Sequence, residues 1–88
     1  MTAYRIAFTP AALRQLASLD PPTRRRVARR IDALGTDPRP AVAEMLKGGN
    51  GEARVRVGDW RVIYVVRQDA LLVLVIKIGP RSDVYRVR

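Results

Sequence analysis

The Gly58-Asp59 pair restricts the fold of this 88-residue chain more than any other feature. Apolar residues recur at alternate positions on both sides of it, over 53–57 and 60–66, which predicts two strands joined by a two-residue turn. Glycine in the first turn position is typical of a type II′ hairpin. Residues whose numbers add up to 117 then lie opposite each other and share a face of the sheet.

This register divides the side chains of the hairpin between two faces. The apolar face should pack against the rest of the domain and consists of Ala53, Val55, Val57, Trp60, Val62 and Tyr64. The other face carries three arginines, because Arg56 lies opposite Arg61 and Arg54 lies opposite Ile63. Opposed like charges cost a sheet roughly 0.2–1 kcal/mol. The cluster therefore indicates an anion site, most plausibly for phosphate, unless the three guanidinium groups simply spread into water.

Two helices are expected between this hairpin and a first strand over 4–8. Thr9-Pro10 and Asp20-Pro21 each combine an N-cap residue with a proline in the first helical position. The first helix should run to about Leu19, and the second should end at a left-handed glycine cap, Gly35. The two should form an antiparallel hairpin.

The remaining segments complete the predicted order of elements. A short helical turn is expected over 43–47, a central strand over 71–78 that Gly79-Pro80 ends, and a last short strand over 84–87. The order β-α-α-β-β-β(-β) predicts an α+β fold, in which a helical hairpin packs on a small antiparallel sheet. Residues 1–88 should form a single domain.

The composition favours a polyanionic partner and excludes much chemistry. Lys and Arg number 17 against 8 Asp and Glu, a formal charge of +9, and all but Lys47 and Lys77 are arginines. A GC-rich genome is the alternative explanation for the arginines. The chain has no cysteine and no histidine, which excludes zinc fingers, thiol nucleophiles and histidine bases. Since the carboxylates are scattered, no metal and no cofactor are expected.

A run of arginines lies within the predicted second helix. Its members are Arg24, Arg25, Arg26, Arg29 and Arg30. If Val27 and Ile31 point inward, then Arg25, Arg26 and Arg29 point outward. Arg24 and Arg30 flank the stripe of core residues. Such a face is either solvated or a docking surface for ribosomal RNA or DNA.

No membrane segment or signal peptide is expected. Residues 1–8 lack a charged segment followed by an apolar core, and the longest apolar run, 70–76, is too short to span a bilayer. A cytoplasmic protein is therefore predicted.

Three motifs, together with the order of elements, resemble the RelE/ParE toxin superfamily over essentially the whole chain. They are Leu46-Lys47-Gly48, the stretch Arg54-Val-Arg56-Val-Gly-Asp-Trp-Arg61-Val-Ile-Tyr64, and the ending Ile78-Gly-Pro-Arg81-Ser-Asp-Val-Tyr85. Arg81 and Tyr85 point to the RelE branch. The resemblance implies a toxin of a type II toxin–antitoxin system that cuts mRNA in the ribosomal A site. The cognate antitoxin, similar to RelB, holds the toxin inactive, and the complex binds operator DNA.

The resemblance also implies roles for individual residues. Arg61, Arg81 and Tyr85 match catalytic positions of the RelE branch. Arg54 and Arg56 match basic residues, often lysines in the family, that would bind the RNA phosphate. The ribose 2′-oxygen would attack the adjacent phosphate, which gives a 2′,3′-cyclic phosphate without a metal ion.

Two other functions remain open. The ParE branch shares the fold, lacks the RNase residues and inhibits DNA gyrase. A plain nucleic-acid-binding domain, or a toxin that has lost its activity, would cause no growth defect when expressed.

Overall fold

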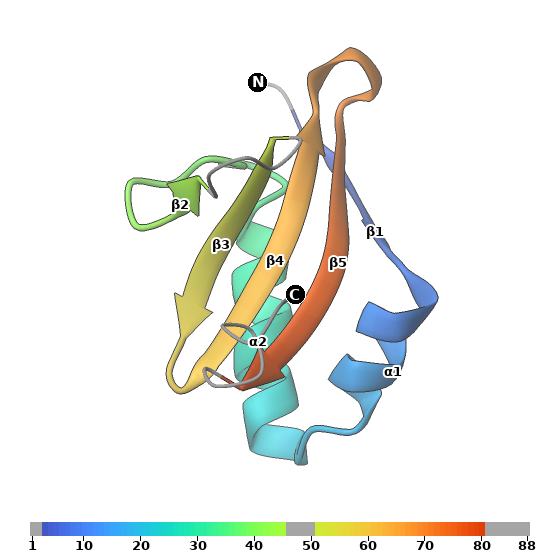
Figure 1. Cartoon of the computed structure of the whole chain (residues 1–88), viewed down its shortest axis with the longest axis vertical. Coiled ribbons are helices and arrows are strands. Elements are labelled where there is room, and N and C mark those ends of the chain that lie inside the picture. The colour runs from blue at the N-terminus through green and yellow to red at the C-terminus, as the bar shows by residue number, and fades with distance from the viewer. Residues whose placement is uncertain (1–2, 46–50, 81–88) are drawn as a thin grey trace.

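The computed structural model describes residues 3–45 and 51–80 of the chain. Two helices lie against one face of a five-stranded sheet whose order is β1-β5-β4-β3-β2 (Figure 1). The elements are β1 (Arg5–Phe8), α1 (Pro10–Ala17), α2 (Pro21–Ala33), β2 (Glu44–Met45), β3 (Glu52–Val57), β4 (Trp60–Arg67), the 3₁₀ turn η1 (Gln68–Ala70) and β5 (Leu72–Pro80). The predicted α+β fold, a helical hairpin on a small antiparallel sheet, is confirmed, and the sheet is antiparallel except where β1 pairs with β5.

The β3–β4 hairpin has the predicted register. Val57 pairs with Trp60, Val55 with Val62, and Arg56 with Arg61. Gly58 has a φ of 61°, the left-handed value that the first position of a type II′ turn requires. The faces of the two strands were therefore assigned correctly from the turn alone.

Both helices begin where the N-cap residues predict. The Thr9 hydroxyl accepts a hydrogen bond from the Ala12 N–H, and the Asp20 carboxylate accepts one from the Thr23 N–H. The bonds from Thr23 lower the pKa of the Asp20 carboxyl. The helix α1 ends at Ala17, slightly before the predicted end at about Leu19.

The prediction of a left-handed cap at Gly35 is wrong. Among the described glycines, only Gly51 and Gly58 have positive φ. Gly35 is instead a point of close backbone approach, since its carbonyl accepts the Tyr4 N–H at 2.7 Å. A Cβ at Gly35 would lie 3.0 Å from the Tyr4 carbonyl oxygen, so glycine serves here by lacking a side chain.

Two parts of the sheet differ from the prediction. The strand β1 pairs in parallel with β5, Arg5 opposite Leu72, because the two helices carry the chain away before it returns to the sheet. Glu44 and Met45 form a short strand against β3 where a helical turn was expected. This strand is held by tertiary pairing that local sequence does not encode. The predicted strand over 84–87 lies outside the described residues.

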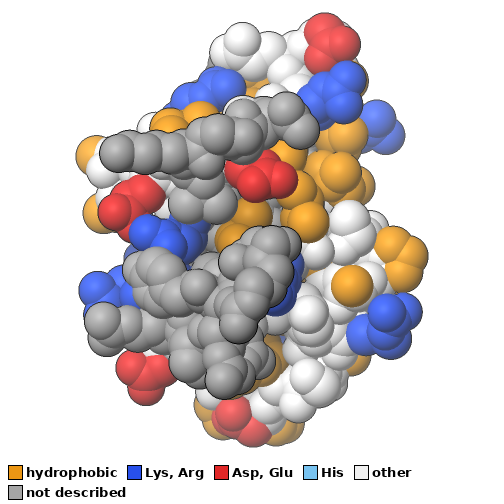
Figure 2. All heavy atoms as spheres, viewed as in Figure 1, with side chains coloured by type: hydrophobic (Ala, Val, Ile, Leu, Met, Phe, Trp, Pro, Cys, Tyr) orange, Lys and Arg blue, Asp and Glu red, His pale blue; other side chains and the backbone are white. Residues whose placement is uncertain are grey.

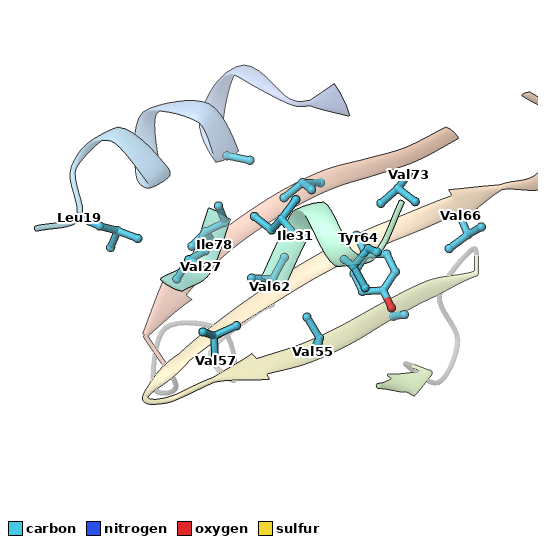
Figure 3. Close-up of a cluster of buried hydrophobic side chains, with 14 residues drawn as sticks. Leu19, Val27, Ile31, Val55, Val57, Val62, Tyr64, Val66, Val73 and Ile78 are labelled. Carbon is cyan, nitrogen blue, oxygen red and sulfur yellow. The ribbon is translucent and has the colours of Figure 1, made fainter. Parts of the chain in front are cut away.

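The core lies between the helices and the apolar face of the hairpin. Figure 3 shows the side chains of α2, β3, β4 and β5 converging in this layer. Tyr64 is fully buried, and its hydroxyl donates to the Pro38 carbonyl oxygen at 2.8 Å. Trp60 is half-buried and packs against the cluster. Both aromatic residues are therefore on the core face, as the register predicts.

A β-bulge in β5 was not predicted. Ile63 pairs with Lys77 but Tyr64 pairs with Val75, so Ile76 is the extra residue. The helix α1 holds this bulge from one side: the Thr9 hydroxyl donates to the Ile76 carbonyl at 2.8 Å, and the Gln15 side-chain oxygen accepts the Ile78 N–H at 2.7 Å.

In the described part of the chain, neither helix has the length and apolar character needed to cross a membrane.

Candidate active site

Three arginines lie together on the face of the sheet that the helices leave uncovered. The pairing of β3 and β4 places Arg56 directly opposite Arg61 and Arg54 opposite Ile63. Figure 2 shows this face of the molecule, with Lys and Arg side chains along its left side, where β3 runs, and others on its right side. The three residues, Arg54, Arg56 and Arg61, are called the three-arginine face below.

These arginines differ in exposure. Arg61 is only 5% exposed and the side chain of Arg54 only 14%, whereas Arg56 is exposed. The alternative of three guanidinium groups spread into water is therefore wrong for Arg54 and Arg61. Arginine keeps its proton even in a buried site. Arg61 is thus a fixed positive charge with little water around it to weaken its field.

A carboxylate already binds to this face. Glu44 on β2 accepts a hydrogen bond from the Arg54 Nη2 at 2.6 Å. The pKa of Glu44 is lowered, first by this bond and by the charge of Arg54, and further by the charges of Arg61 and Arg56. All three guanidinium groups thus act on one carboxylate. The face stabilises an oxyanion, which is the electrostatic property that binding of a phosphate requires.

Two of the predicted site residues, Arg81 and Tyr85, lie outside the described residues. Gly79, two residues before Arg81 in the sequence, lies opposite Arg61 in the β4–β5 pairing. Tyr64, by contrast, is no candidate base. Burial raises the pKa of its phenol, and its hydroxyl is bonded to Pro38.

The arginines of α2 differ in their surroundings, and Arg26 and Arg29 are both exposed and part of a groove. Arg25, Arg26 and Arg29 are exposed, as predicted. Arg24 is half-buried and donates to the carbonyls of Ala17 and Leu19, so it covers the end of α1. A separate group joins α2 to the sheet, because Arg26, Arg29, Arg30 and Arg56 line a common groove.

Within residues 3–45 and 51–80, no three acidic side chains come together in a group that could hold a metal ion.

The family model described as "ParE toxin of type II toxin-antitoxin system, parDE" matches residues 6–85. The chain belongs to the RelE/ParE toxin superfamily. This confirms the resemblance drawn from the sequence motifs. The chain is thus a RelE-like toxin by family.

Several relatives of this toxin carry RelE names. A protein of Methanocaldococcus jannaschii, named as a candidate RelE toxin, is 30% identical in an alignment of 86 residues that covers 94% of this chain and 96% of that protein. A chain of the RelE–RelB complex from Pyrococcus horikoshii is 29% identical with a TM-score of 0.79, and the match covers 91% of this chain and 97% of that one. A chain of the RelBE2 toxin–antitoxin complex from Mycobacterium tuberculosis is 26% identical with a TM-score of 0.82, over 94% and 97% of the two chains.

Sequence reasoning missed two residues of this toxin's charged surfaces. Glu44 was missed because its strand has only two residues and carries no local signal. Arg30 had been placed beside the core stripe, yet it lines the groove with Arg26 and Arg29. The spacing of Arg26, Arg29 and Arg30 along one helix face could have indicated it.

Proposed function

We propose that this toxin is a metal-independent endoribonuclease that cuts mRNA in the ribosomal A site. One observation carries the proposal: Arg61 is buried and permanently charged, with Arg54 and Arg56 beside it on a sheet face that already binds a carboxylate. A fixed positive field at the place where negative charge develops is the largest common source of catalysis in such sites.

The proposed reaction needs only proton transfer and charge stabilisation. The ribose 2′-oxygen attacks the adjacent phosphorus, and the bond from that phosphorus to the next 5′-oxygen breaks. The products are a 2′,3′-cyclic phosphate and a 5′-hydroxyl. One proton leaves the 2′-hydroxyl and one is added to the 5′-oxygen, so neither water nor a redox partner is consumed.

Each site residue has a role in this scheme. Tyr85, as a tyrosinate, takes the proton of the 2′-hydroxyl. Arg61 and Arg81 stabilise the extra negative charge on the phosphorane, with Arg81 near the leaving oxygen. Arg54 and Arg56 orient the phosphate. Since Arg54 binds Glu44 in the free protein, the phosphate joins or replaces that carboxylate when RNA binds.

The partners follow from the same proposal. The toxin works in the cytoplasm on translating ribosomes, and a RelB-like antitoxin neutralises it. The complexes of RelE with RelB from Pyrococcus horikoshii and Methanococcus jannaschii support such a partner. The antitoxin complex would also bind operator DNA.

One observation favours a second function. The family model that matches carries the ParE description, and a ParE-like toxin inhibits DNA gyrase without cutting RNA. The gyrase proposal expects that Tyr85→Phe keeps the toxicity and that cells show DNA damage.

The experiment that separates the two expresses the chain in bacteria without antitoxin and maps new mRNA 5′ ends. Codon-phased cuts in translated messages, absent from the Arg81→Ala/Tyr85→Phe variant, are expected. Growth arrest with intact mRNA in both strains would contradict the endonuclease and support gyrase as the target. No arrest in either strain would indicate a binding module or an inactive toxin.

A matched pair of variants tests the three-arginine face itself. Arg56→Gln removes an exposed guanidinium of the face and should slow cleavage about 10²–10³-fold, as loss of one electrostatic contact typically does. Arg67→Gln removes an exposed arginine from the far end of β4 and should leave cleavage unchanged. Equal activity of the two variants would remove Arg56 from the scheme.

A further inference from the structure

We propose that Lys77 on β5 is the proton donor of the cleavage reaction, the group that protonates the leaving 5′-oxygen. This inference rests on the proposed function and supplies a proton that the reaction needs. The side chains of the three-arginine face do not supply it, because a guanidinium group keeps its proton in a protein. These arginines stabilise negative charge, and a different kind of group has to protonate the departing oxygen.

The β-bulge in β5 brings Lys77 to the three-arginine face. Before the bulge, Val73 and Val75 are fully buried in the core. Regular alternation would place the residue at position 77 on this core side as well. Because Ile76 is extra, Ile78 takes the core position instead, and Figure 3 shows Val73 and Ile78 in the same layer of buried side chains. Lys77 is thereby moved to the opposite face of the sheet.

Two side chains of the α1 region hold the backbone on both sides of Lys77. The Thr9 hydroxyl donates to the Ile76 carbonyl, and the Gln15 side-chain oxygen accepts the Ile78 N–H. Both hydrogen bonds join segments more than 60 residues apart in the sequence. Bulges are common next to active sites, where they redirect a side chain. The packing of α1 on β5 therefore fixes the face on which Lys77 lies.

On this face Lys77 is a diagonal neighbour of the buried Arg61. Lys77 pairs with Ile63, and Arg61, two residues away on β4, pairs with Gly79. Diagonal neighbours of an antiparallel pair are about 7–8 Å apart, a separation that two long side chains can bridge. Gly79 has no side chain, so β5 places no side chain directly opposite Arg61. A phosphate bound by Arg61 is therefore within reach of the Lys77 ammonium.

Lys77 has both the chemistry and the room for this role. An ammonium group is a compact charge with three donors, and it gives up a proton far more readily than a guanidinium group does. Lys77 is half-buried. The strand β1 pairs with β5 only as far as Val75, so no strand flanks Lys77 on its outer side, where it borders a cavity of about 230 Å³ beside α1. The four-carbon stem therefore has space to turn toward the phosphate.

The proton transfer leaves the reaction balanced. As the bond from phosphorus to the 5′-oxygen breaks, a proton passes from the Lys77 Nζ to that oxygen, which departs as a hydroxyl. Tyr85 takes one proton from the 2′-hydroxyl in the same reaction. Lys77 then regains a proton from the solvent and Tyr85 releases one, so the toxin is unchanged after each cut.

The test measures single-turnover cleavage by the full chain of mRNA on programmed ribosomes, with two versions of the message. One is ordinary mRNA, and the other carries sulfur in place of the 5′-oxygen at the cut, because a thiolate leaves without being protonated. Lys77→Arg keeps the positive charge but removes the proton donor. It should cut ordinary mRNA about 10²–10⁴-fold more slowly than wild type, the usual contribution of acid–base catalysis. It should cut the sulfur-containing mRNA at the wild-type rate, which also shows that the variant is folded.

Arg56→Gln is the matched control, because it removes charge stabilisation and no proton donor. It should slow the cutting of both messages. Lys77 is not the donor if Lys77→Arg cuts ordinary mRNA as fast as wild type, or if it is slowed equally on both messages. Either result would leave the proposed function intact, since wild type still cuts. If wild type cuts neither message, the proposed function itself is wrong and the role of Lys77 is rejected with it.

Discussion

Replacing Tyr64 with phenylalanine should destabilise the fold by about 1 kcal/mol without touching the proposed site. The side chain is fully buried, and its hydroxyl donates to the Pro38 carbonyl at 2.8 Å. Phenylalanine keeps the packing and removes the donor. A net hydrogen bond contributes about 0.5–1.5 kcal/mol, and the Pro38 residue is only half-buried, so water can partly replace the lost donor.

The expected loss is measurable by thermal and urea unfolding. For a domain of this size, about 1 kcal/mol lowers Tm by roughly 4–8 °C. The m-value should not change, because the same surface is exposed on unfolding. Tyr4→Phe is the matched control, since Tyr4 is half-buried against the same core and its hydroxyl makes no hydrogen bond to any residue that the structure describes. It should change stability by less than about 0.5 kcal/mol.

The pH dependence gives a second, independent check. Burial raises the pKa of the Tyr64 phenol above its ordinary 10.0. A raised pKa in the folded state means that the contribution of Tyr64 is complete below pH 10 and is lost as the pH rises toward the folded-state pKa. The stability difference between wild type and Tyr64→Phe should therefore shrink above pH 10. Equal stability of Tyr64→Phe, Tyr4→Phe and wild type at pH 7 would refute the role given to this hydroxyl.

Two further predictions concern the N-cap and the edge of the sheet. Thr9→Ala loses both the cap of α1 and the hydrogen bond to the Ile76 carbonyl, so urea unfolding should show a loss of about 2 kcal/mol in the free energy of unfolding. Thr9→Ser keeps both hydrogen bonds and should lose little stability. An equal loss of stability in the two variants would contradict the role given to the Thr9 hydroxyl. Because Arg54 lowers the pKa of Glu44, the ion pair persists above that pKa and is lost as the pH falls through it. Arg54→Gln should raise the Glu44 pKa toward the ordinary 4.5 in a carboxyl NMR titration, whereas Arg5→Gln, on the opposite edge strand, should not.

The sequence by itself determined those features of this protein that depend on residues close together in the chain. Gly58 with a two-residue turn sets which residues of the hairpin face each other, so the three-arginine face could be inferred from residue numbers alone. Thr9-Pro10 and Asp20-Pro21 likewise determine where the helices begin, because an N-cap acts within one turn.

Only the tertiary structure decided how distant segments meet. The parallel pairing of β1 with β5, the bulge at Ile76 and the two-residue strand at Glu44 depend on partners far away in the sequence. The burial of Arg61 and the contact of Arg54 with Glu44 depend on the same packing. The groove that Arg26, Arg29, Arg30 and Arg56 line exists because α2 lies beside the β3–β4 turn. The periodicity of apolar side chains can predict which face of a helix or strand is buried, but not which other element will lie against that face.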